Sequence, residues 1–178
     1  MKTDKAALVY AGKTQTECAF DMLSAHCDKV FVSNREDQAN APGRAGLPQI
    51  HDSFQDLGPM GGILSAMTAY PGVAWLVLSC DLPYLDNETL RNLIARRNRA
   101  KPATAYASAH DGLPEPLCAI YEPAARETLL RFVDQGIHCP RKAMIRSDIE
   151  LLKPVNPHAL DNINTPEEHQ DVLRHIGP

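Results

Sequence analysis

The segment Ala74–Leu85, AWLVLSCDLPYL, constrains the fold of this chain most strongly. Its first five residues are apolar, and a short continuous apolar run is typical of a strand buried on both faces, as in a parallel sheet under helices. Asp81 follows at the end of this strand, and Pro83 stops the hydrogen-bonded ladder two residues later. Ligands bind at the carboxyl ends of strands in open α/β sheets. Asp81 is therefore either a ligand of a divalent metal or an aspartate that caps the next helix or turn.

Strands and helices are predicted to alternate along the rest of the chain. Neither an internal repeat nor a linker interrupts this pattern, which indicates one α/β domain, 1–178, with a mostly parallel sheet. Short apolar runs predict strands, and apolar residues at the helical period predict helices. The expected strands are 6–10, 30–32, 48–50, 74–78, 103–107, 117–121 and 149–152, and the expected helices are 14–26, 63–69, 86–97, 123–136, a short one from 139 and a last one from 165.

Three polar residues are predicted to lie together where strands end. Right-handed crossover connections would place Ser33, Asp52 and Asp81 along one edge of the sheet. A glycine-rich turn, Leu57–Gly62, opens the next helix and would present N–H groups and a positive dipole end beside this edge. Such a turn can bind an anion or the edge of a nucleobase. Taken alone, it favours the other interpretation, in which the glycines let the helix pack closely on the sheet.

Composition argues against several classes of protein. The net charge is -4, which gives no indication of a nucleic-acid partner. The longest apolar run is too short to span a membrane, and no signal peptide is recognisable. The five cysteines form no CxxC pair and the seven histidines form no HExxH motif, so neither a structural zinc site nor a disulfide framework is expected. We therefore expect a cytoplasmic protein with no membrane and no nucleic-acid partner.

Five segments, in order, resemble the molybdenum cofactor guanylyltransferases, which belong to a larger nucleotidyltransferase family with a Rossmann-like fold. The first, MKTDKAAL, resembles the end of a signature that runs from a glycine pair to arginine-methionine-glycine-x-aspartate-lysine. The matches span nearly the whole chain, and the resemblance implies a three-layer α/β sandwich. The other four resemble a second glycine turn, a metal-aspartate strand, an acceptor-side strand and a C-terminal signature: LGPMGGILSAM, LSCDLPYL, LPEPLCAIY and NINTPEE.

The resemblance begins inside the first signature. Met1 aligns with the signature's methionine, and Lys2 stands where glycine is usual. The family's first strand, near the middle of its sheet, and the loop that wraps the triphosphate are not matched. Losing a central strand would expose two unpaired edges and part of the core. Either the chain folds with a gap or the sequence is truncated at its N-terminus. We expect truncation, poor nucleotide binding in this form, and a homo-oligomer or partner chain that fills the missing strand.

The resemblance implies transfer of GMP from GTP to the phosphate of molybdopterin, with release of pyrophosphate. It makes Asp81 the ligand of a Mg²⁺ ion that bridges phosphate oxygens. Lys5 matches a lysine that contacts the triphosphate, whereas from the residues alone it is a solvated surface lysine. Gly58, Gly61 and Gly62 match the nucleotide-binding turn.

Four further residues match the family pattern. Ser33 stands where some members have an asparagine near the guanine, and Asp52 matches a nucleotide contact before the second glycine turn. Asn162 and Asn164 match the C-terminal signature, where an amide offers both a donor and an acceptor to a pterin or a phosphate. From the residues alone, Asp52 is a strand-end cap and the asparagines belong to a turn before Thr165.

Alternative functions remain open. A family member that uses CTP, another NTP or a sugar phosphate would carry the same segments, because part of the base-selecting region is not matched. A non-catalytic paralogue without the phosphate-binding loop would also keep the sheet, although Asp81, Asp52 and the asparagine signature argue against it. Arg141 and Lys142 are candidates for reading a phosphate or form a surface charge pair, and Glu115 has no assigned role.

Overall fold

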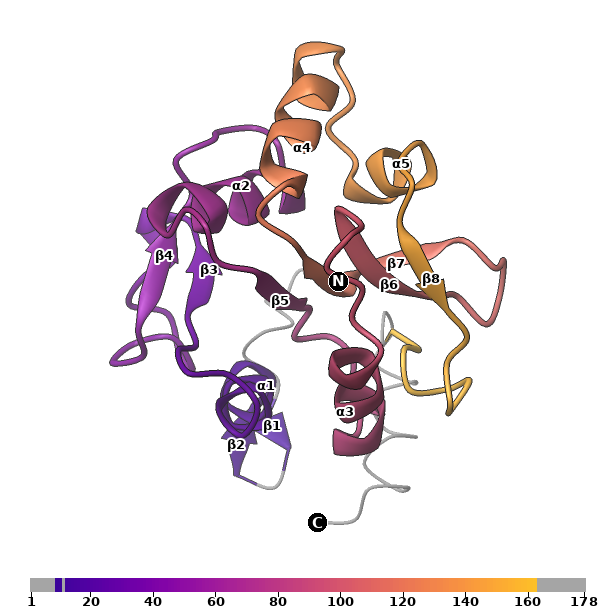
Figure 1. The fold of residues 1–178 in the computed structure, drawn as a ribbon. Helices are drawn as coiled ribbons and strands as arrows, with labels where there is room; N and C mark the ends of the chain where they lie inside the picture. The colour runs from indigo at the N-terminus through magenta and orange to yellow at the C-terminus, as the bar shows by residue number, and fades with distance from the viewer. Residues whose placement is uncertain (1–8, 11, 163–178) are drawn as a thin grey trace.

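The computed structural model describes residues 9–10 and 12–162, in which strands and helices are interspersed along the chain (Figure 1). The α/β class expected from the sequence is confirmed. The last predicted helix, from Thr165, lies outside the described residues. The elements are β1 (Val9–Tyr10), β2 (Lys13–Thr14), α1 (Gln15–Ser24), β3 (Val32–Asn34), a 3-10 helix (Glu36–Gln38), β4 (Gln49–His51), α2 (Pro59–Ala69), β5 (Trp75–Leu78), α3 (Asn87–Ala95), β6 (Ala103–Ala107), β7 (Pro114–Tyr121), α4 (Ala125–Asp134), α5 (Pro140–Ile145) and β8 (Glu150–Leu152).

The described strands form separate sheets. β3 and β4 are parallel, and a four-stranded sheet has the order β5-β7-β6-β8. In the latter, β6 and β8 are parallel, but β7 is antiparallel to both β5 and β6. The mostly parallel arrangement expected from the sequence is therefore mixed with antiparallel pairs. The reason is local, because the short connection from β6 to β7 contains no helix and can join only antiparallel neighbours.

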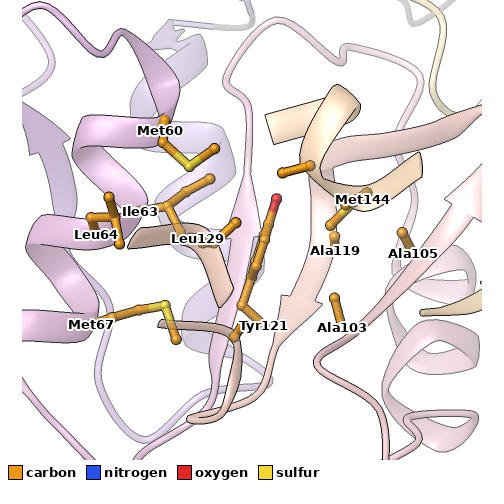
Figure 2. Close-up of a cluster of buried hydrophobic side chains, with 12 residues drawn as sticks. Met60, Ile63, Leu64, Met67, Ala103, Ala105, Ala119, Tyr121, Leu129 and Met144 are labelled. Atoms are coloured by element: carbon orange, nitrogen blue, oxygen red, sulfur yellow. The ribbon is translucent and has the colours of Figure 1, made fainter. Parts of the chain in front are cut away.

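Helices cover both faces of the four-stranded sheet. Along β7, Ala119 and Tyr121 point to one face, and Cys118 and Ile120 point to the other. The first face packs against α2, α4 and α5 through a cluster that includes Met60, Ile63, Leu64, Met67, Leu129 and Met144 (Figure 2). The second face packs against α3 and α1 through Leu90, Leu93, Met22 and Leu23. The result is the expected three-layer arrangement.

A polar cap fixes the start of α1. The Thr14 hydroxyl accepts a hydrogen bond from the Glu17 backbone N–H at 3.2 Å, and the Glu17 carboxylate accepts one from the Thr14 N–H at 2.7 Å. This is a capping box, and it confirms the helix start predicted near Thr14. Cys18, one of the apolar residues whose helical period predicted the helix 14–26, is exposed rather than packed inward.

The segment that contains β5 differs from its prediction. Residues 75–78 form the expected strand, but their side chains are only half-buried. Among the described strands, β5 pairs with β7 alone. Its other side borders a cavity of about 1450 Å³, which we call the central cleft and which lies between residues 30–34 and residues 73–80. An unpaired edge beside a cavity explains why these apolar side chains are not fully covered.

Three smaller predictions need correction. β3 begins two residues later than the apolar run at Val30 suggested. α2 begins at Pro59, so that Gly61 and Gly62 lie in its first turn rather than in a turn before it. Ile94, one of the apolar residues whose helical period predicted an inward face for the helix 86–97, is 37% exposed. Within the described residues, no helix is long and apolar enough to span a membrane.

Candidate nucleotide site

Ser33 and Asp52 meet at the carboxyl ends of β3 and β4. The two strands are parallel and in register, and the Asp52 N–H donates to the Asn34 carbonyl at 3.0 Å. The Ser33 hydroxyl donates a long hydrogen bond of 3.4 Å to the Asp52 carboxylate. Both residues line the central cleft. The predicted proximity of these two residues is therefore confirmed.

The environment of Asp52 shifts its pKa. Burial raises the pKa of this carboxyl, and the Ser33 hydrogen bond and the charge of Arg35 oppose the shift only in part. Asp52 is thus a half-buried carboxylate whose charge is incompletely compensated by the protein. Such a group favours a ligand that brings a cation or hydrogen-bond donors to it.

The first turn of α2 lies directly against this pair. A Cβ atom on Gly62 would lie 2.5 Å from the Ser33 hydroxyl oxygen and 3.4 Å from an Asp52 carboxylate oxygen. A Cβ atom on Gly61 would lie 2.5 Å from the Phe54 carbonyl oxygen. Gly61 therefore requires glycine for close approach to the backbone, whereas at Gly62 an added methyl group meets the end of the Ser33 side chain. The contact at Gly61 is the packing interpretation of the glycine-rich turn.

Gly58 also serves the start of α2. It is the N-cap residue and has a φ of 53°, in the region that favours glycine, and Pro59 follows at the first helical position. Gly58, Pro59 and Gly62 line the central cleft. The N-terminus of α2, with its N–H groups and positive dipole end, therefore opens onto the cleft beside Ser33 and Asp52.

Asp81 is placed differently from the other two strand-end residues. It is half-buried, and its carboxylate accepts a hydrogen bond of 2.5 Å from the Ser79 hydroxyl. Ser79 and Cys80 belong to the lining of the central cleft, and Asp81 follows directly after them. Asp86, rather than Asp81, caps α3, because its carboxylate accepts from the Thr89 N–H at 2.7 Å. Asp81 therefore does not cap α3, and its interpretation as a cap of the turn that follows β5 stays open beside the metal-ligand interpretation.

The structure does not bring every predicted site residue to this edge. Lys5 and Asn164 lie outside the described residues. Asn162 is exposed and follows Asp161, which His110 and His158 contact at 2.9 Å each. Among the residues described, no group of three or more histidine, cysteine or acidic side chains is arranged to hold a metal ion.

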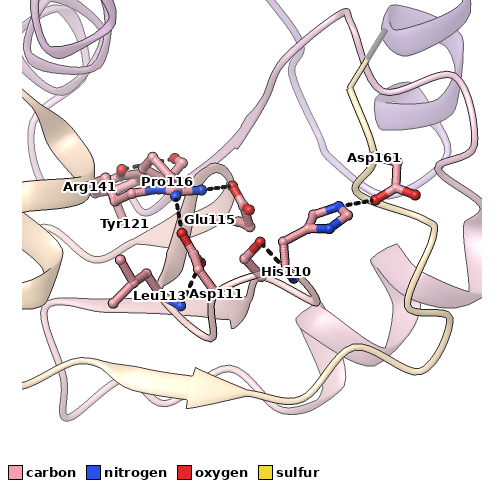
Figure 3. Close-up of polar contacts among 9 residues, drawn as sticks. His110, Asp111, Leu113, Glu115, Pro116, Tyr121, Arg141 and Asp161 are labelled. Atoms are coloured by element: carbon pink, nitrogen blue, oxygen red, sulfur yellow. Dashed lines mark hydrogen bonds and ion pairs between the residues drawn. The ribbon is translucent and has the colours of Figure 1, made fainter. Parts of the chain in front are cut away.

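Arg141 and Glu115 bind each other. Arg141 contacts the Glu115 carboxylate at 2.8 Å and the Asp111 carboxylate at 3.1 Å, and these three residues lie together between α5 and the β6–β7 connection (Figure 3). This arrangement neutralises Arg141 and supports the charge-pair interpretation over phosphate binding. It also assigns Glu115 a structural contact.

Four cationic residues that line the cleft were not predicted from the sequence: Lys29, Arg35, Arg44 and Arg97. Arg35 follows β3 and pairs with Asp37 at 3.0 Å, with both side chains exposed. Arg97 makes a two-point contact with the buried carboxylate of Glu122, at 2.5 and 2.7 Å. The position of Arg35 directly after a strand end was the available signal, whereas nothing in the sequence linked Arg97 to Glu122.

The chain is similar to proteins of molybdenum cofactor biosynthesis. The model of the MobA-like NTP transferase domain matches residues 1–151. A molybdenum cofactor biosynthesis bifunctional protein from Synechocystis is 37% identical over 172 residues, which cover 97% of this chain and 50% of that protein. The chain thus spans about half the length of this relative. A molybdenum cofactor guanylyltransferase from Shewanella sp. strain MR-4 is 27% identical over 182 residues, which cover 98% of this chain and 88% of that protein.

Solved structures show the same fold. Molybdopterin-guanine dinucleotide biosynthesis protein A from Archaeoglobus fulgidus superposes with a TM-score of 0.77 at 21% identity, covering 98% of this chain and 91% of that one. A 2-C-methyl-D-erythritol 4-phosphate cytidylyltransferase from Thermus thermophilus superposes with a TM-score of 0.68 at 17% identity, covering 96% and 91%. With most of its length matched by the family model and its fold shared by these structures, the chain belongs to the family of MobA-like NTP transferase domains.

Proposed function

We propose that this chain is a nucleotidyltransferase that moves GMP from GTP to molybdopterin. In this reaction an oxygen of the molybdopterin phosphate attacks the α-phosphorus of GTP, the bond from that phosphorus to the β-phosphate oxygen breaks, and pyrophosphate leaves. The family match over residues 1–151 and the names of the relatives support the proposal. The structural observation that carries it is the contact of Ser33 and Asp52 with Gly62 beside the start of α2.

We assign the nucleotide to this edge of the central cleft. The N–H groups at the start of α2 suit a phosphate or the edge of a base. The Asp52 carboxylate accepts hydrogen bonds, and the amine of guanine is a donor. Because cytosine also carries an amine, the preference for GTP over CTP has to be measured with both nucleotides.

We assign Mg²⁺ to Asp81. A single carboxylate oxygen donor beside the cleft wall fits this ion, which prefers oxygen ligands and usually takes the others from substrate phosphates and water. When bound, Mg²⁺ neutralises charge on the phosphate oxygens. The Ser79 hydroxyl fixes the orientation of the Asp81 carboxylate.

The remaining assignments concern the triphosphate and the acceptor. Lys5 contacts the triphosphate as a point charge, and Asn162 and Asn164 contact molybdopterin through their amides. We place the reaction in the cytoplasm, because none of the five cysteines, all of which lie in the described part of the chain, forms a disulfide. A second candidate is a protein that binds a nucleotide without converting it to product. The separation of β3 from β5 by the central cleft favours this candidate.

The proposal is tested by incubating the chain with molybdopterin, Mg²⁺ and either GTP or CTP, and measuring pyrophosphate and dinucleotide product. Transfer is expected with GTP, at a low rate because the sequence predicts poor nucleotide binding in this form. Asp81→Asn should abolish transfer without changing the melting temperature, whereas the matched control Asp148→Asn, at a residue 84% exposed, should leave transfer unchanged. Saturable GTP binding without any product would support the second candidate, and binding of neither nucleotide would refute both.

A further inference from the structure

The segment that follows β4 lies against the start of α2. A Cβ atom on Gly61 would lie 2.5 Å from the Phe54 carbonyl oxygen, and one on Gly62 would lie 3.4 Å from an Asp52 carboxylate oxygen. Close packing of this kind limits how near the two segments come. A hydrogen bond fixes direction as well as distance, so the relative orientation of the segments depends on the hydrogen bonds between them.

The hydroxyl of Ser65 provides these hydrogen bonds. It accepts one from the Ser53 backbone N–H at 2.8 Å and a second from the Ser53 hydroxyl at 3.1 Å, and it donates one to the Gly61 carbonyl at 2.7 Å. A hydroxyl has one proton to donate and two lone pairs that accept, so the full hydrogen-bonding capacity of Ser65 is used. The residue that follows Asp52 is therefore tied to the first turn of α2 through one side chain.

The rest of α2 holds Ser65 in place. Ser65 is 3% exposed, and Met60, Leu64 and Met67 of the same helix belong to the hydrophobic cluster (Figure 2). Because protein interiors are close-packed, the helix cannot shift without disturbing this cluster. The Ser65 hydroxyl is therefore a fixed point, and its removal would release the segment after β4 while leaving the cluster intact.

The link to Ser65 bears directly on Asp52. The Asp52 N–H donates to the Asn34 carbonyl of β3 at 3.0 Å, and Ser53, which follows it, is bonded to Ser65. We propose that Ser65 is a positioning residue for the nucleotide site, which sets the Asp52 carboxylate against the N–H groups at the start of α2. A site whose groups are held in the bound geometry beforehand binds its ligand more tightly. The inference rests on the proposed nucleotide site, but it concerns binding alone and does not require transfer.

The chain offers a matched control for Ser65. The Ser147 hydroxyl donates to the Ala143 carbonyl at 2.8 Å, which is the same bond to the residue four positions earlier that Ser65 makes to Gly61. Ser147 follows α5, which lies on the opposite side of the molecule from β3 and β4 (Figure 1). Ser147→Ala therefore removes a similar bond at a distance from Asp52. Alanine is favourable in a helix, so both alanine variants should fold.

The test measures the affinity for GTP by titration calorimetry in the wild type and in both variants. Ser65→Ala should bind GTP about tenfold more weakly than the wild type, and Ser147→Ala should bind it equally well. Because Ser65 acts through Asp52, the two effects should not add. In an Asp52→Asn background, the further change Ser65→Ala should weaken binding by less than roughly twofold. In the free protein, hydrogen exchange at the Ser53 amide should be faster in Ser65→Ala, since this N–H has lost its acceptor.

Three results would overturn the positioning role while leaving the proposed nucleotide site intact. These are equal GTP affinity of Ser65→Ala and Ser147→Ala, the same loss from Ser65→Ala with and without Asp52→Asn, and unchanged exchange at the Ser53 amide. Failure of the wild type to bind GTP is a different result, because it would refute the proposed nucleotide site and the positioning role together. Binding without transfer would leave the positioning role supported.

Discussion

Replacing Gly62 by alanine separates the packing role of the glycine-rich segment from its proposed role in binding nucleotide. The added methyl group would lie 2.5 Å from the Ser33 hydroxyl oxygen and 3.4 Å from the Asp52 carboxylate. The Ser33 hydroxyl is the end of an exposed side chain, and its rotation relieves the clash at the expense of the 3.4 Å bond to Asp52. The fold can therefore accept alanine, but the proposed nucleotide site is altered.

Gly61→Ala is the matched comparison, because there the methyl group meets a backbone atom. It would lie 2.5 Å from the Phe54 carbonyl oxygen, which cannot rotate away. Overpacking of this kind typically costs about 1–3 kcal/mol. Alanine in a helix gives a free energy of unfolding that is higher than with glycine by roughly 0.5–1 kcal/mol. The free energy of unfolding of Gly62→Ala should therefore lie within about 1 kcal/mol of the wild-type value or slightly above it.

Both variants are measured by thermal unfolding and by GTP binding. Each kcal/mol corresponds to roughly 2–4 °C in the melting temperature of a domain of this size. Gly61→Ala should therefore melt several degrees lower, and Gly62→Ala should melt near wild type yet bind GTP about tenfold more weakly, since 1.4 kcal/mol of lost contact is one decade. Equal destabilisation by the two variants, or unchanged GTP binding by Gly62→Ala, would refute the reasoning.

Three further predictions concern stability. Arg97→Met removes the two-point partner of the Glu122 carboxylate, which is 6% exposed. The free energy of unfolding from a urea titration should fall by about 3 kcal/mol. A decrease of less than about 0.5 kcal/mol would contradict the importance of this pair. Thr14→Ala removes the hydroxyl of the α1 capping box and should lower the free energy of unfolding by about 1 kcal/mol, with loss of helical signal if the cap is essential to α1. Burial raises the pKa of Asp52, so the folded state holds this proton more tightly than the unfolded state, and the stabilisation from protonation is lost as the pH rises through the folded pKa. Asp52→Asn should therefore be more stable than wild type at pH 7, and this advantage should shrink on titration toward pH 3; an advantage that grows in acid would show that the sign is wrong.

The sequence predicted local features well because they depend on neighbouring residues. The helix starts near Thr14 and near Asp86 are signalled by capping residues within a few positions of each start. The ends of β3 and β4 brought Ser33 and Asp52 together as expected, since parallel neighbours align their carboxyl ends. These parts of the fold and of the site follow from short-range chemistry and from strand order.

Pairing between distant segments was not predictable in the same way. The apolar run of β5 indicated burial on both faces, but burial depends on whether a strand lies on each side, and β5 has β7 on only one side among the described strands. Likewise, Arg97 and Glu122 are 25 residues apart and meet only once α3 and β7 are folded. Gly61 and Gly62 looked like turn residues, because their contacts with Phe54 and Ser33 become visible only in three dimensions.

The most direct test of the central claim is a mass-spectrometric measurement of the product formed from GTP, Mg²⁺ and molybdopterin. The proposed function predicts a molybdopterin guanine dinucleotide with stoichiometric pyrophosphate, and its loss in Asp81→Asn. Failure to form this product when GTP binds normally, or formation at an unchanged rate by Asp81→Asn, would contradict the assignment of this chain as a metal-dependent guanylyltransferase.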